Sequence, residues 1–187
     1  LKQNARYAYV DDRFVSVLHG YEFMTSPTTG LDNQSAIGRY AIDWSQTNKV
    51  YGIDNTAQAV FRTGEVEHTV LLGADYYHFN SEFLGRYQYA PPGIDLYNPI
   101  YGAPIDFSKA SVNTWDNTIR QTGLYVQDQL KWDRWFLTLG GRYDWAVTEN
   151  NQPLYKVDNS IRNEKFSGRL GFGYLFDNGV TPYFSYS

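Results

Sequence analysis

Residues 121–145 read QTGLYVQDQLKWDRWFLTLGGRYDW, and this segment determines the fold class we expect for the chain. Apolar and polar side chains alternate on both sides of Asp133-Arg134, as in two β-strands joined by a tight turn. The side chains on one face are Leu124, Val126, Leu130, Trp132, Leu137, Leu139, Tyr143 and Trp145. Those on the other face are Tyr125, Gln127, Gln129, Lys131, Thr138, Arg142 and Asp144. Aliphatic side chains occupy the middle of the first face and aromatic ones its ends. That arrangement is typical of a transmembrane β-strand, which has an apolar band between two aromatic girdles.

The composition is compatible with this interpretation. The chain has 187 residues, of which 18% are aromatic and only 19% are charged, less than the usual quarter. Its mean hydropathy is −0.51, and no run of about 18 apolar residues predicts a transmembrane helix. A membrane β-strand needs no such run, because only alternate residues meet lipid.

Composition also excludes several classes of function. The chain has no cysteine, which excludes disulfides, thiol catalysis and cysteine–metal sites within it. Its net charge is −4 and it has no cluster of Lys or Arg, so we expect no nucleic acid as partner.

The rest of the chain alternates between short turns and long irregular stretches. Further strands are expected over residues 2–13, 50–62, 66–83, 166–176 and 180–187. Short turns are expected near residues 64, 133 and 178, the last at Asn178-Gly179. Long loops are expected over residues 14–45, 85–118 and 149–163, where prolines and other turn-forming residues gather. For residues 14–45 the alternative is a shorter loop with strand extensions at its stems.

Short and long connections follow each other strictly, and in an up-and-down meander alternate connections lie at the same end. One end of the sheet is therefore expected to have only tight turns and the other only long loops. Bacterial outer-membrane barrels have this asymmetry, with short periplasmic turns and long extracellular loops. We therefore predict an all-β fold, an antiparallel transmembrane β-barrel in the outer membrane of a Gram-negative bacterium.

Several motifs resemble one family of such barrels. QTGLYVQDQ (121–129), LGGRYDW (139–145) and YLFDNGVTPYFSYS (174–187) are similar to segments of the TonB-dependent siderophore receptors. FRTGEVEHTVLLGAD (61–75) and LYNPIYG (96–102) make the chain most similar to the ferrichrome and other hydroxamate-siderophore receptors within that family. The resemblance covers nearly the whole chain, and the motifs are specific as a set.

The resemblance implies a plugged barrel of about 22 strands. Residues 1–187 would supply about seven of them, and the plug domain, the segment that contacts TonB and the closing C-terminal strand would lie outside. An open sheet edge in lipid leaves backbone groups unsatisfied, so we expect this segment alone to be no functional transporter. Recovery of a folded, ligand-binding barrel from the isolated segment would contradict that expectation.

The resemblance also implies ligand-binding residues. Tyr21 and Tyr87 match positions where ferrichrome receptors have ligand-contacting aromatic residues, and His19 stands where the family has another aromatic. The His19 departure leaves the particular siderophore open. The alternative for each residue is a role in a girdle or in loop packing, since the chain has 17 Tyr. The iron of a ferric siderophore is already fully coordinated, so no metal ligand, cofactor or catalytic residue is required from the protein.

Three charged features remain to be placed. Arg142 and Asp144 share the inward face of one strand, where an ion pair lining the lumen is expected. Asp128 falls among the lipid-facing residues, so it lies either near the membrane interface or at a bulge. His68 has no partner at metal-ligand spacing, and its place beside the turn at Gly64 favours a surface role at the periplasmic end.

The resemblance thus implies an outer-membrane receptor that imports ferric hydroxamate siderophores, with energy supplied through TonB. Its expected partners are the ferric siderophore, the TonB complex and outer-membrane lipid; in this family phages and bacteriocins also commonly attach at the long loops. The alternatives are a passive porin and a receptor for another class of siderophore. An outer-membrane enzyme is disfavoured because no catalytic constellation is found at suitable spacing.

Overall fold

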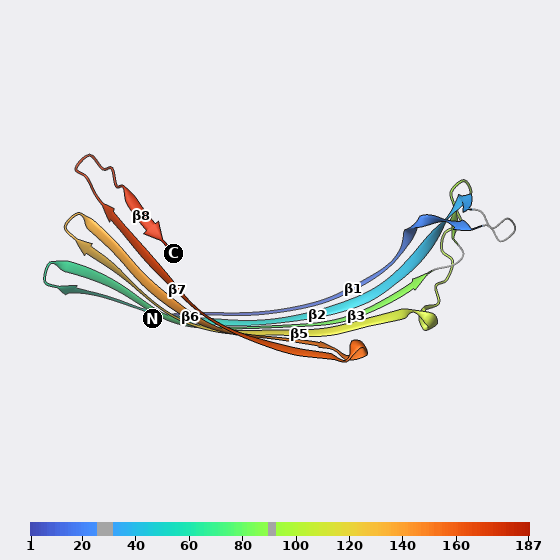
Figure 1. Cartoon of the computed structure of the whole chain (residues 1–187), viewed down its shortest axis with the longest axis horizontal. Coiled ribbons are helices and arrows are strands. Elements are labelled where there is room, and N and C mark those ends of the chain that lie inside the picture. The colour runs from blue at the N-terminus through green and yellow to red at the C-terminus, as the bar shows by residue number, and fades with distance from the viewer. Residues whose placement is uncertain (26–31, 90–92) are drawn as a thin grey trace.

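A computed structural model of the chain shows one curved antiparallel sheet (Figure 1). It describes residues 1–25, 32–89 and 93–187, and for residues 21, 22, 25, 32 and 33 it describes the backbone alone. The strands are β1 (Lys2–Thr25), β2 (Asp32–Thr63), β3 (Val66–Tyr89), β4 (Ile94–Asp95), β5 (Ser111–Trp132), β6 (Trp135–Gln152), β7 (Val157–Tyr174) and β8 (Tyr183–Tyr186). Two short 3₁₀ helices are η1 (Phe107–Lys109) and η2 (Pro153–Tyr155).

The sheet is an up-and-down meander. The strand order is β1-β2-β3-β5-β6-β7-β8, so each long strand pairs with the next one along the chain, and short β4 pairs with β2. In Figure 1 the turns that follow β2, β5 and β7 lie at one end of the sheet, and the longer connections lie at the other. Among the described residues, no helix has the length and apolar character needed to cross a membrane.

Local backbone geometry explains the tight turns. Gly64 and Asp133 have φ values of 63° and 51°, the left-handed conformation that short hairpin turns require. The connection after β7 is a turn, as Asn178-Gly179 predicts, but it is wider than two residues. Phe176 and Val180 are hydrogen-bonded across it, and β8 begins only at Tyr183.

Strand occupies most of the described residues in the predicted loops 14–45 and 149–163, whereas in the predicted loop 85–118 residues 96–106 are irregular, as expected. The predicted extents of these loops are therefore wrong, and the strand extensions considered at the stems of residues 14–45 are present. β1 continues to Thr25, β3 to Tyr89 and β6 to Gln152, while β2 and β5 already begin at Asp32 and Ser111. The hydrogen-bonded pairing between neighbouring strands continues far beyond the segments whose alternating apolar and polar side chains predicted the strands. Register is continuous through these extensions except for shifts between His19 and Met24.

The sheet has almost no interior. Ala41 is the sole buried hydrophobic side chain among the described residues, and large apolar side chains are exposed along the strands. A soluble domain of this size would bury a substantial apolar core. A sheet with two exposed faces is instead what a barrel wall provides, with one face toward lipid and the other toward the lumen.

Candidate functional site

The two faces of the sheet differ in chemistry. Cross-strand register places Asp54, Asp75, Gly123 and Asp144 in one row, and Thr56, Gly73, Tyr125 and Arg142 in the next row of the same face. We call this the polar face. The opposite, apolar face carries Leu72, Ala74, Leu124, Val126, Tyr143 and Phe166 at the same height.

The apolar face has the dimensions of a membrane-spanning band. On β6, Trp135 and Trp145 are ten residues apart and point to this same face. The ring of Trp135 packs edge-on against the ring of Tyr174, with 4.7 Å between the ring centroids. The ring centroids of Trp145 and Tyr143 are also 4.7 Å apart. Ten strand residues tilted by about 40° span about 25 Å, which is the height of the apolar band in outer-membrane barrels. The two aromatic girdles predicted from residues 121–145 are therefore present.

An ion cluster occupies the middle of the polar face. Arg142 donates to both carboxylate oxygens of Asp75 at 2.6 and 3.0 Å, and its Nε and Nη2 donate to Asp144 at 2.9 and 2.6 Å. Gln121 also donates to Asp144 at 3.0 Å. The inward pairing of Arg142 and Asp144 expected from sequence is confirmed, and Asp75 from β3 joins it.

Glycines make room for this cluster. A Cβ on Gly73 would lie 2.0 Å from the ring of Tyr125, whose hydroxyl donates to Asp54 at 2.9 Å. A Cβ on Gly123 would lie 2.1 Å from Arg142 Nη2. Both residues lack side chains because the larger side chains of neighbouring strands lie across them.

The apolar face contains one charged pair. Asp128 faces Val70 and Leu139 in unbroken register, so no bulge turns it inward. It accepts a hydrogen bond at 2.7 Å from Nδ1 of His68, whose ring stacks on Phe61 at 5.0 Å. His68 thus has a specific partner, which spacing along the sequence could not reveal. Asp128 is four residues from Trp132, toward the short-turn end of the band.

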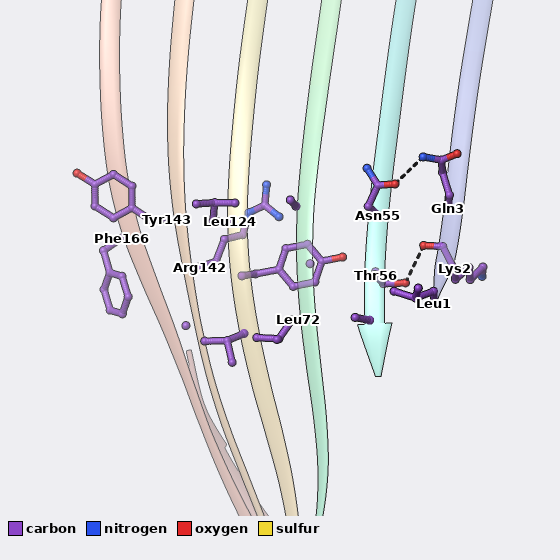
Figure 2. A pocket seen from close by; sticks show the side chains of 16 residues that line it. Leu1, Lys2, Gln3, Asn55, Thr56, Leu72, Leu124, Arg142, Tyr143 and Phe166 are labelled. Carbon is purple, nitrogen blue, oxygen red and sulfur yellow. Dashed lines mark hydrogen bonds between the residues drawn. The ribbon is translucent and has the colours of Figure 1, made fainter. Parts of the chain in front are cut away.

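A hollow of about 910 Å³ lies mainly on the apolar face (Figure 2). Leu72, Leu124 and Phe166 lie around it. The small residues Ala57 and Ala74 also line it. Most of its lining thus belongs to the face that corresponds to the lipid side of a barrel wall, and Tyr125 and Arg142 of the polar face also line it.

We call the girdle that contains Trp145 the upper girdle. Beyond it the strands extend into a region that we call the outer wall. It consists of the polar-face residues within 8–18, 40–50, 79–89, 111–119 and 148–152. Among these described residues there is no Lys or Arg, and Asp12 is the sole acidic residue. A solvent-facing surface without cations is unusual, since charged side chains normally cover exposed sheet faces.

Aromatic side chains cross four strands of the outer wall. We call Phe14, Trp44, Phe83 and Trp115 the aromatic row; successive ring centroids are 5.7, 6.1 and 5.1 Å apart. Trp115 is seven residues beyond Thr122, the partner of Trp145 in the upper girdle, so the row lies about 18 Å above that girdle. The row was not predicted from sequence.

Uncharged polar groups lie below the aromatic row. Gln46 donates to Ser81 at 3.1 Å and to Asn48 at 3.3 Å, and Ser81 donates to Asn48 at 2.6 Å. Ser81 is buried, whereas the amide groups remain partly open to solvent. Such a surface offers ring faces and amide hydrogen bonds, but no charge to balance an anion.

The outward surface at the same height is different, because it carries ion pairs. Lys49 pairs with Glu82 at 3.2 Å, and Arg120 with Glu149 at 2.7 Å. Buried Asp43 accepts from Arg13 at 3.2 and 3.3 Å and also pairs with Arg86. The hydrogen bond from Arg13 and the two positive charges hold the pKa of the Asp43 carboxyl below its ordinary value.

The three residues predicted to bind ligand are not all brought together. Tyr87 lies on the outer wall, and its ring flanks Gly85 opposite the ring of Phe83. By register His19 lies on the opposite face with Val17, and its Nδ1 is 3.2 Å from the carbonyl oxygen of Gly20. The side chain of Tyr21 lies outside the described part of the chain. For all three, ligand contact stays a prediction.

Within the described ranges, no group of three or more His, Asp or Glu side chains could hold a metal ion. Residues 1–187 match the family described as "TonB dependent receptor-like, beta-barrel". The chain belongs to this family. It forms part of the β-barrel of a TonB-dependent receptor, as the sequence motifs implied, and its relatives are receptors and transporters rather than enzymes.

Three relatives support the same placement. The receptor segment is 35% identical over 205 residues to the "Ferrichrome outer membrane transporter/phage receptor" of Escherichia coli K12, covering all of this chain and 27% of that protein. It is 38% identical over 158 residues to the "Ferrioxamine B receptor" of Salmonella typhimurium SL1344, covering 84% of this chain and 22% of that protein. It is 31% identical over 194 residues to the "Ferrioxamine receptor" of Yersinia enterocolitica, covering 100% and 26%. The receptor segment therefore spans about a quarter of the length of these relatives.

Solved structures share the receptor's fold. An open form of the ferric-catecholate import receptor Fiu from E. coli K12 superposes with a TM-score of 0.68 at 16% identity, covering 98% of this chain and 32% of Fiu. The siderophore receptor PiuA from Acinetobacter baumannii superposes with a TM-score of 0.58 at 16% identity, covering 98% of this chain and 28% of PiuA. These likenesses establish the transmembrane barrel architecture, and the family places the receptor in a Gram-negative outer membrane.

Proposed function

We propose that the receptor containing this chain imports ferric hydroxamate siderophores across the outer membrane, with energy supplied through TonB. The observation that carries the proposal is the outer wall, which has aromatic rings and amides but no Lys or Arg among its described residues. A ferric trihydroxamate complex has a neutral core. Ferric tricatecholate and ferric citrate complexes are anionic and would need cations to offset their desolvation.

The names of the relatives support the same substrate class, since those proteins are called ferrichrome and ferrioxamine receptors. Iron is cargo here, and we propose no resident cofactor. Tyr87 is proposed as a ligand contact because it stands on the outer wall beside Phe83 and is 39% exposed. Tyr21 and His19 remain proposed contacts from the family resemblance, and attachment of phages or bacteriocins at the long connections remains a prediction.

The test is binding of ferric siderophores to the full-length receptor in detergent, followed by quenching of tryptophan fluorescence. The panel is ferrichrome, ferrioxamine B, a ferric catecholate and ferric citrate. Saturable, high-affinity quenching by a hydroxamate alone is expected, and Tyr87→Ala should weaken it. Uptake of ⁵⁵Fe-labelled hydroxamate by cells should require TonB. Preference for the catecholate or citrate would indicate another siderophore class, and no binding together with open-channel conductance in a planar bilayer would indicate a porin.

A further inference from the structure

Asp12 stands at one end of the aromatic row. It lies opposite Gln46 on β2, which faces Phe83 on β3, which in turn faces Trp115 on β5. Phe14 follows Asp12 on the same face of β1. Among the described residues, no side chain forms a hydrogen bond or ion pair with Asp12. Its neighbour Asp11 points to the opposite face, where Thr47 donates to it at 3.3 Å.

Three features of this surface favour positive charge in a ligand. The outer wall has no cation among its described residues. Phe14 stacks on Trp44 and Phe83 stacks on Trp115, and the ring faces that this stacking leaves uncovered attract cations through their quadrupoles. The carboxylate of Asp12 adds a full negative charge at the end of the row. An anionic ligand would meet repulsion and no compensating charge, whereas a neutral body with a cationic arm would fit both parts of the surface.

We propose that the aromatic row and Asp12 form an outer subsite for a neutral ferric hydroxamate complex that carries a free ammonium group. The rings of Trp115, Phe83 and Trp44 contact the apolar surface of the complex, and Asp12 attracts the ammonium. The subsite rests on the proposed function, whose substrate class it narrows. It lies about 18 Å above the upper girdle, so a ligand would meet it before it reached the depth of the membrane.

Two probes test the role of Asp12, because they share iron coordination and differ in one charge. Ferrioxamine B has a free primary ammonium, and its N-acetyl derivative is neutral. The full-length receptor should bind ferrioxamine B about threefold more tightly than the acetylated complex at low salt, as expected for one partly solvated charge pair. Asp12→Asn should abolish this preference, and Asp11→Asn, the matched control on the opposite face, should retain it.

The aromatic row has its own test. Trp115→Leu should weaken binding of both probes about tenfold without changing their ratio, and Trp115→Phe should restore most of the affinity because it keeps a ring. Tyr51→Ala removes an aromatic side chain from the outward girdle and should change neither affinity. Heat-modified mobility in gel electrophoresis checks that each variant forms the barrel.

The outcomes separate this inference from the function on which it rests. A receptor that binds both probes equally, or whose preference survives Asp12→Asn, overturns the charge selection and leaves hydroxamate uptake intact. Unchanged affinities in Trp115→Leu show that the row packs against another part of the receptor and does not hold ligand. A receptor that binds neither probe nor ferrichrome overturns the subsite and the proposed function together.

Discussion

Replacing Arg142 with methionine should destabilise the barrel through the charges it leaves behind. The guanidinium contacts four oxygens of Asp75 and Asp144, and its carbon lies 5.5 Å from the ring centre of Tyr125. Both aspartates are 23% exposed and would face each other without a cation.

The size of the effect follows from the exposure of the cluster. Breaking a fully buried ion pair costs about 3–5 kcal/mol, and breaking a fully exposed one costs less than about 1 kcal/mol. Arg142 is one-third exposed and its partners about one-quarter. We therefore expect Arg142→Met to lower the free energy of unfolding by about 2–3 kcal/mol.

The assay is guanidinium-induced unfolding of the full-length receptor in detergent, followed by tryptophan emission. Arg120→Met is the matched control, because the ion pair of Arg120 with Glu149 is about 40% exposed, and it should cost less than about 1 kcal/mol. Asp75→Asn should destabilise the wild type. In the Arg142→Met background the same change should restore about 1 kcal/mol, because it removes an uncompensated charge. Equal costs at Arg142 and Arg120, or a further loss on adding Asp75→Asn, would refute this reasoning.

Three further predictions concern other parts of the sheet. Gly73→Ala places a Cβ 2.0 Å from the Tyr125 ring and should lower the free energy of unfolding by about 1–3 kcal/mol, whereas Gly52→Ala, with no atom within 4 Å, should be tolerated in the same titration. His68→Leu leaves a lipid-side carboxylate without its partner and should cost about 2 kcal/mol, most of which a second change, Asp128→Leu, should recover. Asp43 has a lowered pKa, so its stabilising effect is full above about pH 4 and is lost as the pH falls through its folded-state pKa; the acid-induced loss of stability should be smaller in Asp43→Asn.

The sequence predicted the membrane-spanning part well because the two faces of each strand have different surroundings there, lipid on one side and the lumen on the other. Leu124 and Val126 must face lipid, while Tyr125 and Gln127 face the lumen, and this contrast is visible as strict alternation. Asp128 is the exception, and the structure explains it by its pairing with His68, sixty residues away in the chain.

The outer extensions were missed because the two faces exchange polarity there. On β5 the outward residues Asp116 and Thr118 are polar, while Trp115 and Ile119 face inward. Apolar and polar side chains still alternate there, but the apolar ones lie on the other face. Because the pattern reverses along the strand, the sequence looks like an irregular segment. The aromatic row could have been found by extending the register of residues 121–132 backward and accepting this inversion. The ion cluster around Arg142 could not have been, because Asp75 and Asp144 are 69 positions apart.

The central claim is that the inner face of the outer wall, and not its outward face, receives a ferric hydroxamate. Asn113 and Thr114 are neighbours in sequence that point to opposite faces of β5, and the chain has no cysteine of its own. A fluorophore is attached to Asn113→Cys or Thr114→Cys in a full-length receptor otherwise free of cysteine, and ferrioxamine B is titrated in. We expect saturable quenching of the label at position 113 and little at 114. Equal quenching at both positions, or a silent label at 113 in a receptor that binds the radiolabelled complex, would contradict the account.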